Sequence, residues 1–175
     1  MTVRLAQLNP YLLLLVVALA AGCKSPEERK RDQAISTFRL HLEGNPDGNQ
    51  STAVIQIAGV ELRVNNASFL DETSVTNAAV VDTRDGGFAI RVQYDPHGTL
   101  VLDSVTSENR GRRIAVFTQY GVRKLEHRRW LAAPYGAPIT DGVLIFTPVA
   151  TREESEEIVL GLNNVAKKIS KRNRY

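Results

Sequence analysis

The feature that most constrains this chain is a long amphipathic segment near its C-terminus, which begins at Thr151. Thr151 and Glu154 form the T-x-x-E pattern of a capping box, in which each side chain accepts a hydrogen bond from the other residue's backbone amide. Glutamates crowd the expected positive end of the helix dipole and lysines the negative end. Apolar residues recur at helical spacing and define one stripe: Ile158, Val159, Leu162, Val165, Ala166 and Ile169. Such a stripe has to be covered by a sheet or by another helix.

Short apolar segments before this helix predict the strands that cover it. Three of them, Arg113–Thr118, Trp130–Ala133 and Val143–Thr147, directly precede the helix. Two further segments, Thr37–Glu43 and Phe88–Tyr94, alternate apolar and polar residues, which is typical of strands with one buried face. The pattern therefore predicts helices and strands in separate runs, an arrangement typical of an α+β fold.

Local patterns place the remaining elements. Ala53–Ile57 and Val60–Val64 are predicted as strands. Asp71 is a candidate N-cap for a short helix, after which Val80-Val81 returns to strand. Asp85-Gly86 is typical of a hairpin turn. Together these patterns predict a largely antiparallel arrangement, because short turns join antiparallel strands.

The segment from Thr99 to Val105 fits two structures. Its β-branched residues favour a strand by propensity. A helix over residues 98–109 would instead place Val101, Leu102 and Val105 on one face, with Gly111 close to its end. Propensity and periodicity leave both alternatives open.

The N-terminus resembles a bacterial lipoprotein signal. Arg4 precedes the apolar run Tyr11–Leu19, which is too short to span a bilayer. Residues 20–23 (AAGC) resemble a lipobox, although leucine, usual three places before the cysteine, is replaced by alanine. We therefore predict a signal peptide over residues 1–22 and covalent lipid on Cys23. The alternative is that Cys23, the only cysteine of the chain, is a buried thiol.

The residues after Cys23 predict where the protein resides. Lys24 stands where an aspartate would be expected to retain a lipoprotein in the inner membrane, so we expect the periplasmic face of the outer membrane. The polar residues 23–36 are predicted to form a flexible tether, or alternatively to begin a helix. Removal of residues 1–22 takes away one cation, Arg4, and lowers the net charge from +3 to +2. So weak a positive charge argues against a nucleic-acid partner.

A family resemblance is carried by a series of short segments in a fixed order. They are Phe88–Val92, Tyr94–Gly98, Val105–Arg112, Arg113–Phe117, Ala132–Pro134, Ile139–Gly142, Val143–Phe146 and Thr151–Glu154. In this order, residues 69–168 resemble the head subdomain of the first periplasmic domain of SecDF-type protein-export proteins. The resemblance implies a helix at 98–109 and a module that engages exported or envelope polypeptides.

The chain departs from that family in two ways. It has no hydrophobic run beyond the signal peptide, so the membrane-embedded, proton-coupled part of the family has no counterpart in this sequence. The turn after the strand Arg113–Phe117 is also longer, because Gln119–Arg129 is inserted there.

The inserted turn is the candidate partner-binding site. Cations and flanking aromatic residues suit anionic headgroups, a cell-wall polymer or an acidic partner. The alternative is a solvated hairpin arm with Trp130 turned into the core. The candidate residues are Tyr120, Arg123, Lys124, His127, Arg128, Arg129 and Trp130.

No sequence pattern predicts catalysis or a metal site. The histidines His41, His97 and His127 are far apart, and no nucleophile, zinc or phosphate-binding motif is present. The glutamates of 153–157 spread around a first helical turn and do not converge as metal ligands would. We therefore expect no catalytic residue, no metal, no cofactor other than the lipid and no small-molecule substrate.

These patterns combine into one reading. We predict an α+β domain over residues 37–170, with a mainly antiparallel sheet, two or three helices packed on one face, and a basic tail at 171–175. Its expected function is non-catalytic binding of polypeptides in the cell envelope, accessory to protein export, at the basic turn or an unpaired sheet edge. The alternative is a structural envelope lipoprotein that binds a cell-wall polymer or an assembly subunit.

Overall fold

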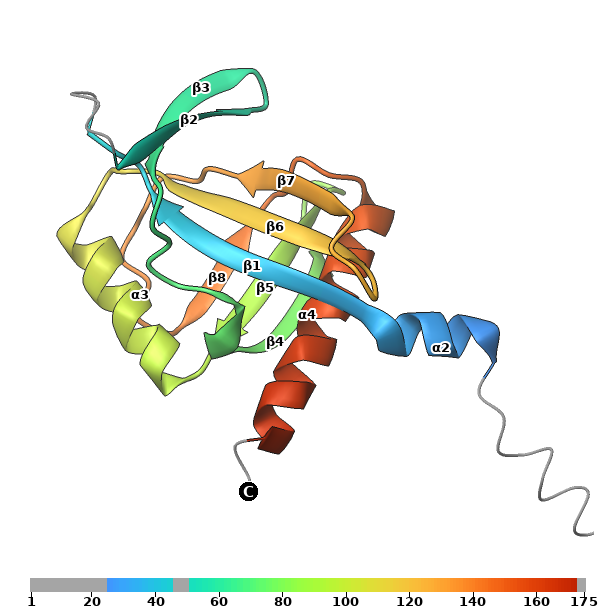
Figure 1. Cartoon of the computed structure of the whole chain (residues 1–175). Helices are drawn as coiled ribbons and strands as arrows, with labels where there is room; N and C mark the ends of the chain where they lie inside the picture. Colours follow the sequence, from blue (N-terminus) through green and yellow to red (C-terminus); the bar gives the residue numbers. More distant parts are fainter. Residues whose placement is uncertain (1–24, 46–50, 173–175) are drawn as a thin grey trace, which may run out of the picture.

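The structure, a computed structural model, describes residues 25–45 and 51–172 (Figure 1). The predicted signal peptide, the lipidation site Cys23 and the last residues of the predicted basic tail lie outside the described residues. The lipoprotein interpretation therefore stays a prediction.

The described residues form an α+β fold in which every strand pairing is antiparallel, as the sequence predicts. One 3-10 turn, η1, accompanies the helices and strands. In chain order the elements are α2 (Pro26–Gln33), β1 (Ala34–Leu42), β2 (Thr52–Ile57), β3 (Val60–Asn65), η1 (Glu72–Ser74), β4 (Val75–Asp82), β5 (Phe88–Tyr94), α3 (Pro96–Glu108), β6 (Ile114–Val122), β7 (His127–Ala132), β8 (Val143–Phe146) and α4 (Arg152–Arg172).

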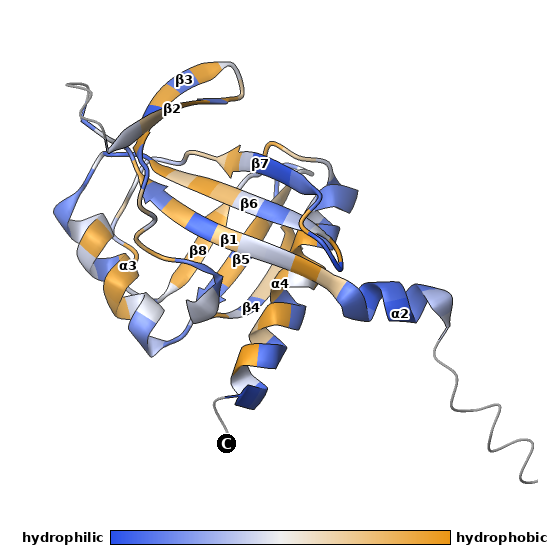
Figure 2. Ribbon diagram, viewed as in Figure 1, coloured by the Kyte–Doolittle hydropathy of each residue, from blue (hydrophilic) through white to orange (hydrophobic). Residues whose placement is uncertain are grey.

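The strands divide among three sheets, of order β1-β6-β7, β4-β5-β8 and β2-β3. The first two share one core, in which Phe38 of β1 and Phe146 of β8 have ring centroids 6.0 Å apart. Helix α4 adds Ile158 and Leu162 to this core and packs against both β1 and β4 (Figure 1). Apolar residues alternate with polar ones along these strands and around α4 (Figure 2).

Helix α4 begins with the predicted capping box. The Glu154 amide donates to Thr151 Oγ1 at 3.2 Å, and the Thr151 amide donates to Glu154 Oε2 at 3.0 Å. Ile158 and Leu162 of the predicted stripe are fully buried, and Gly161 is buried beside them. The stripe therefore faces the strands, as its periodicity predicts.

The described part of the predicted tether is a helix and not a flexible segment. Ser25 and Glu28 form a second capping box at the start of α2. At the other end, Asn164 of α4 donates to the carbonyl oxygens of Arg31, at 2.7 Å, and Ala34, at 3.1 Å. The first strand consequently begins at Ala34, ahead of the predicted Thr37. The helical alternative is therefore the correct one: the Ser25–Glu28 cap is a local pattern, whereas the bonds from Asn164 are long-range contacts that composition does not reveal.

The structure also decides two other segments, one against the prediction and one in agreement with the family resemblance. The helix expected after Asp71 is only the turn η1, because β4 begins at Val75, where it pairs with Tyr94 of β5. The ambiguous segment at Thr99–Val105 is helical, as the family resemblance implied. It belongs to α3, whose N-cap Asp95 accepts from the Gly98 amide at 2.7 Å.

Candidate partner-binding site

The predicted basic site forms the hairpin of β6 and β7, and strand alternation sends its side chains to two faces. Tyr120 pairs with His127, and Thr118 with Arg129, so these side chains face α4. Gln119 pairs with Arg128, and Phe117 with Trp130, on the opposite face. The predicted residues therefore do not form one continuous basic surface.

Tyr120 and Arg129 hold this hairpin to α4 through Glu154. The Tyr120 hydroxyl donates to Glu154 Oε1 at 3.2 Å, and Arg129 Nη1 lies 2.9 Å from Glu154 Oε2. Arg129 Nη1 also donates to the Val149 carbonyl oxygen at 3.1 Å. The Thr151 amide, followed by Arg129 and Tyr120, lowers the pKa of Glu154 despite its partial burial. This cluster stabilises the packing of β7 on α4, and Glu154 compensates the charge of Arg129.

Trp130 is half-buried on the other face. Its ring centroid lies 4.9 Å from that of Phe117 and 5.3 Å from that of His41. His41 Nδ1 lies 2.8 Å from the Asn65 carbonyl oxygen, and burial lowers the pKa of His41. The indole packs beside the apolar cluster under the β2-β3 hairpin. Trp130 thus has the position expected for the alternative in which it is turned into the core.

The remaining members of the predicted site are exposed at or near the hairpin turn: Arg123, Lys124, His127 and Arg128. Arg123 is tied to α2, since its Nε donates to Gln33 Oε1 at 2.7 Å and its amide to the Gln33 carbonyl at 3.0 Å. His127 stacks on Tyr120 at 5.2 Å. Lys124 and Arg128 are the members with the most open surroundings.

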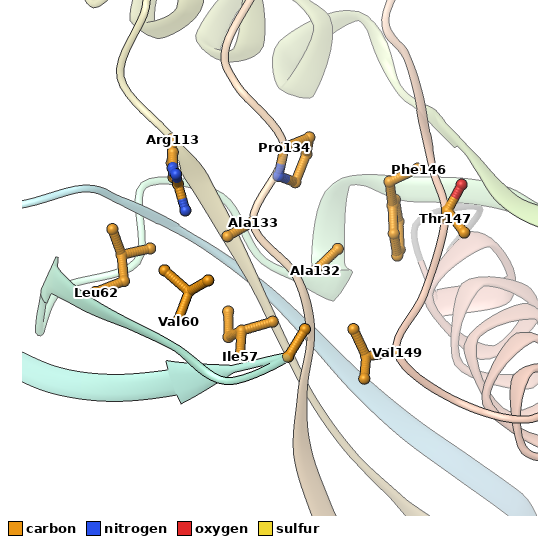
Figure 3. Close-up of a pocket in the computed structure, with 11 residues that line it drawn as sticks. Ile57, Val60, Leu62, Arg113, Ala132, Ala133, Pro134, Phe146, Thr147 and Val149 are labelled. Atoms are coloured by element: carbon orange, nitrogen blue, oxygen red, sulfur yellow. The ribbon is translucent and has the colours of Figure 1, made fainter.

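A second candidate site is an apolar pocket where the β2-β3 turn meets the ends of β7 and β8 (Figure 3). Its volume is about 390 Å³. Arg113 lies at one end and Phe146, Thr147 and Val149 at the other (Figure 3). The other lining residues are apolar: Ile57, Ala58, Val60, Leu62, Ala132, Ala133 and Pro134. One cation beside an apolar floor is a combination typical of binding sites.

Strand β8 is the edge of its sheet and runs directly into this pocket. The Tyr94 amide donates to the Gly142 carbonyl at 2.9 Å, and the Val143 amide turns instead to Asp141 Oδ1 at 3.0 Å. Because hydrogen-bonded and non-bonded pairs alternate in an antiparallel ladder, the peptide groups of Ile145 point away from β5. Ile145 therefore presents an amide and a carbonyl at an open edge, one residue from Phe146 of the pocket.

The surroundings of the pocket are unusually apolar for a surface. Val60 and Val149, which line it, are each 46% exposed, and Ile145 beside it is 56% exposed. Sequence reasoning missed this site. The exposed apolar residues of the β2-β3 turn were a weak local indication, but the pocket joins segments from four parts of the chain.

The other edges of the two three-stranded sheets are partly occupied in the described chain. Beside β1, the Leu40 amide donates to Leu70 O at 2.9 Å, and beside β7 the Val149 amide donates to Leu131 O at 2.6 Å. On β4, Asn163 bonds both backbone groups of Ala78. Of the edges of these two sheets, β8 therefore has the most room for an added strand.

No family model and no curated protein sequence matches this chain. Its fold resembles solved SecDF structures. One, described as a membrane component that enhances protein export, is 16% identical, with 82% of this chain and 70% of that chain covered and a TM-score of 0.56. A second, SecDF in a super-membrane-facing form, is 19% identical with a TM-score of 0.55. This chain covers 21% of that second protein, and 81% of this chain is matched.

At these identities the likeness concerns the fold, and it confirms the resemblance inferred from the order of sequence segments. Within residues 25–45 and 51–172, no helix is both long and apolar enough to cross a membrane.

Proposed function

We propose that this chain is a non-catalytic module that binds extended polypeptides in the bacterial cell envelope. It is held at the membrane by lipid on Cys23 and is accessory to protein export. The link to export is supported by the fold shared with SecDF, one structure of which is described as enhancing protein export. The lipid anchor rests on the sequence of residues 1–23.

The observation that carries the proposal is the open edge of β8 beside the apolar pocket. An extended segment added to a sheet edge gains main-chain hydrogen bonds, while a neighbouring pocket takes one of its side chains. Ile145 offers the backbone groups, and the pocket beyond Phe146 is large enough for an aliphatic or aromatic side chain. Backbone recognition tolerates many sequences, as a module for varied polypeptides requires.

A second function, a structural lipoprotein bound to an anionic cell-wall polymer, is favoured by one feature. Lys124 and Arg128 are exposed at the β6-β7 hairpin. Such binding would be sensitive to salt, because exposed charges are screened. Binding at β8 would be much less sensitive.

The proposed function is tested by an Ile145→Pro variant. Proline removes the outward amide of Ile145, and edge strands tolerate proline where the missing amide faces solvent. The matched control is Ile145→Val, which keeps the amide and the β-branched shape. A photo-crosslinker is then placed at Val149 and, in a control protein, at the exposed Leu100 of α3. Each protein is mixed with a short unstructured peptide that contains leucine.

We expect crosslinking at Val149 and not at Leu100. Affinity for the peptide should fall about fivefold or more in Ile145→Pro but not in Ile145→Val, which corresponds to the loss of one backbone hydrogen bond. Equal labelling at Val149 and Leu100 would contradict the proposal. So would salt-sensitive binding that is lost in an Arg128→Gln variant and unchanged in Ile145→Pro; this result would favour the polymer-binding alternative.

A further inference from the structure

We infer that this site selects extended segments in which an acidic residue lies two positions before or after an apolar residue, on the same face of the segment. The inference rests on the proposed function and names the sequence class that the same site would prefer. Its basis is the position and bonding of Arg113, the charged residue among those that line the pocket.

Arg113 is held in place at the pocket from two sides. Its amide donates to Glu43 Oε2 at 2.8 Å, which fixes the backbone at the base of β6. Its Nη2 donates to the hydroxyl of Tyr135 at 2.7 Å, and the guanidinium carbon lies 4.6 Å from the centre of the Tyr135 ring. Tyr135 itself is 68% exposed, so the two side chains form a half-open wall beside the apolar floor.

The guanidinium of Arg113 has donors to spare. Tyr135 occupies one of the five N–H donors of the guanidinium. Among the described residues, ion pairs join Arg129 to Glu154 and Arg152 to Asp82, and neither pair involves Arg113. The Glu43 carboxylate accepts a hydrogen bond from the backbone amide of Arg113 and not from its side chain. A planar guanidinium with its charge uncompensated suits a carboxylate, which it can bind through two parallel bonds.

The neighbouring floor determines which carboxylate fits. Ala133 and Ala132 lie between Arg113 and Phe146 in the view of Figure 3. Because alternate side chains of an extended segment share one face, a side chain that fills the apolar floor leaves the residue two positions away to face Arg113. Because the site is half-open, we expect a modest preference of about three- to fivefold for an acidic residue at that position, in the upper range of exposed ion pairs.

The test uses three fluorescein-labelled peptides that differ at one position. Each contains a single leucine in a Gly/Ser/Thr background, and the second residue after leucine is Asp, Asn or Lys. Binding to the complete mature chain is measured by fluorescence anisotropy at low and high salt. The variants are Arg113→Gln and a matched control, Arg63→Gln, which changes an exposed arginine on the opposite face of the β2-β3 hairpin.

We expect the Asp peptide to bind about three- to fivefold more tightly than the Asn peptide, and the Lys peptide to bind most weakly. Arg113→Gln should make Asp and Asn equal, while Arg63→Gln should keep the preference. Equal affinity of the Asp and Asn peptides for the unaltered chain would overturn the inference and leave the proposed function standing. Failure of all three peptides to bind would overturn both.

A charge reversal keeps the test valid if Arg113→Gln alters folding. Arg113→Glu should prefer the Lys peptide over the Asp peptide, a change of sign that general destabilisation cannot produce. Circular dichroism of each variant reports whether the fold is retained. A folded Arg113→Glu protein that still prefers the Asp peptide would show that another group selects the carboxylate.

Discussion

The carboxamide of Asn163 bonds the peptide groups of Ala78 in the way a neighbouring β-strand would. The Ala78 amide donates to Asn163 Oδ1 at 2.8 Å, and Asn163 Nδ2 donates to the Ala78 carbonyl oxygen at 2.9 Å. The adjacent Asn164 reaches the other way, to the carbonyl oxygens of Arg31 and Ala34. Helix α4 thus connects the edge strand β4 to the junction of α2 and β1.

Replacement of Asn163 by alanine should destabilise the protein by about 2–4 kcal/mol. Ala78 is 3% exposed, so its amide and carbonyl would be left without partners in a site that excludes water. Urea denaturation measures the change. The control Asn164→Ala should cost about 1 kcal/mol, because it leaves no amide unpaired and the Arg31 carbonyl keeps the Ala34 amide as a donor. Equal losses in the two variants would contradict the strand-like role of Asn163.

Gly161→Ala should also destabilise, although alanine is the better helix former. A Cβ at Gly161 would lie 2.2 Å from Ser36 Oγ and 2.6 Å from the Ile35 carbonyl carbon. To remove these close contacts, α4 has to move away from β1. Such overpacking costs about 1–3 kcal/mol, which on average exceeds the roughly 1 kcal/mol gained in helix propensity. The melting temperature should fall in Gly161→Ala and stay nearly constant in Ser170→Ala, at an exposed position of α4. A rise in Gly161→Ala would show that this helix–strand contact is loose.

Stability should decline as the pH falls below about 6.5, and His41 should account for part of the decline. Burial, with a smaller effect of Arg39, lowers the pKa of His41 below its ordinary value of 6.5. The unfolded chain then binds a proton at a higher pH than the folded chain, so acidification favours unfolding until the folded-state pKa is passed. The free energy of unfolding, measured by urea at about pH 7 and about pH 5, should depend less on pH in His41→Gln.

His127→Gln serves as the matched control for this effect, because His127 is exposed. An unchanged pH dependence in His41→Gln, or an equal change in His127→Gln, would rule out the assignment to His41.

Ala58→Asn should stabilise the β2-β3 hairpin by about 0.5–1 kcal/mol. Ala58 has φ of 51° and Gly59 has φ of 79°, the left-handed values that a two-residue turn of this type requires. Asparagine accepts this conformation more readily than alanine does. Thermal unfolding should show the gain, and Ala67→Asn, outside the turn, should show none. A loss of stability in Ala58→Asn would mean that contacts of the Ala58 methyl group at the pocket outweigh the backbone strain.

Several elements were predictable because their signals are local. The capping box of Thr151 and Glu154, the stripe on α4 and the alternation in β5 each lie within a few turns or residues. The helix α3 is different, because β-branched residues favoured a strand there. Its Asp95 cap and the burial of Leu102 against the sheets override that propensity.

The candidate site was not predictable in the same way. The basic turn is a cluster of cations in the sequence, but pairing of β6 with β7 turns neighbouring residues to opposite faces. Arg129 is then held by Glu154, a partner 25 residues away in the chain. The apolar pocket joins Ile57, Arg113, Ala133 and Val149, which no local pattern relates.

By itself, the sequence determined the kinds of elements, the caps and the apolar faces, because hydrogen bonding and periodicity act between near neighbours in the chain. Only the tertiary structure decided which strand edges are covered and which cations are paired. Asn163 bonds Ala78 of β4 and Val149 bonds Leu131 of β7, whereas Ile145 of β8 has no backbone partner on its outer side among the described residues. Edges and free charges depend on what packs beside them, and that depends on contacts between residues far apart in sequence.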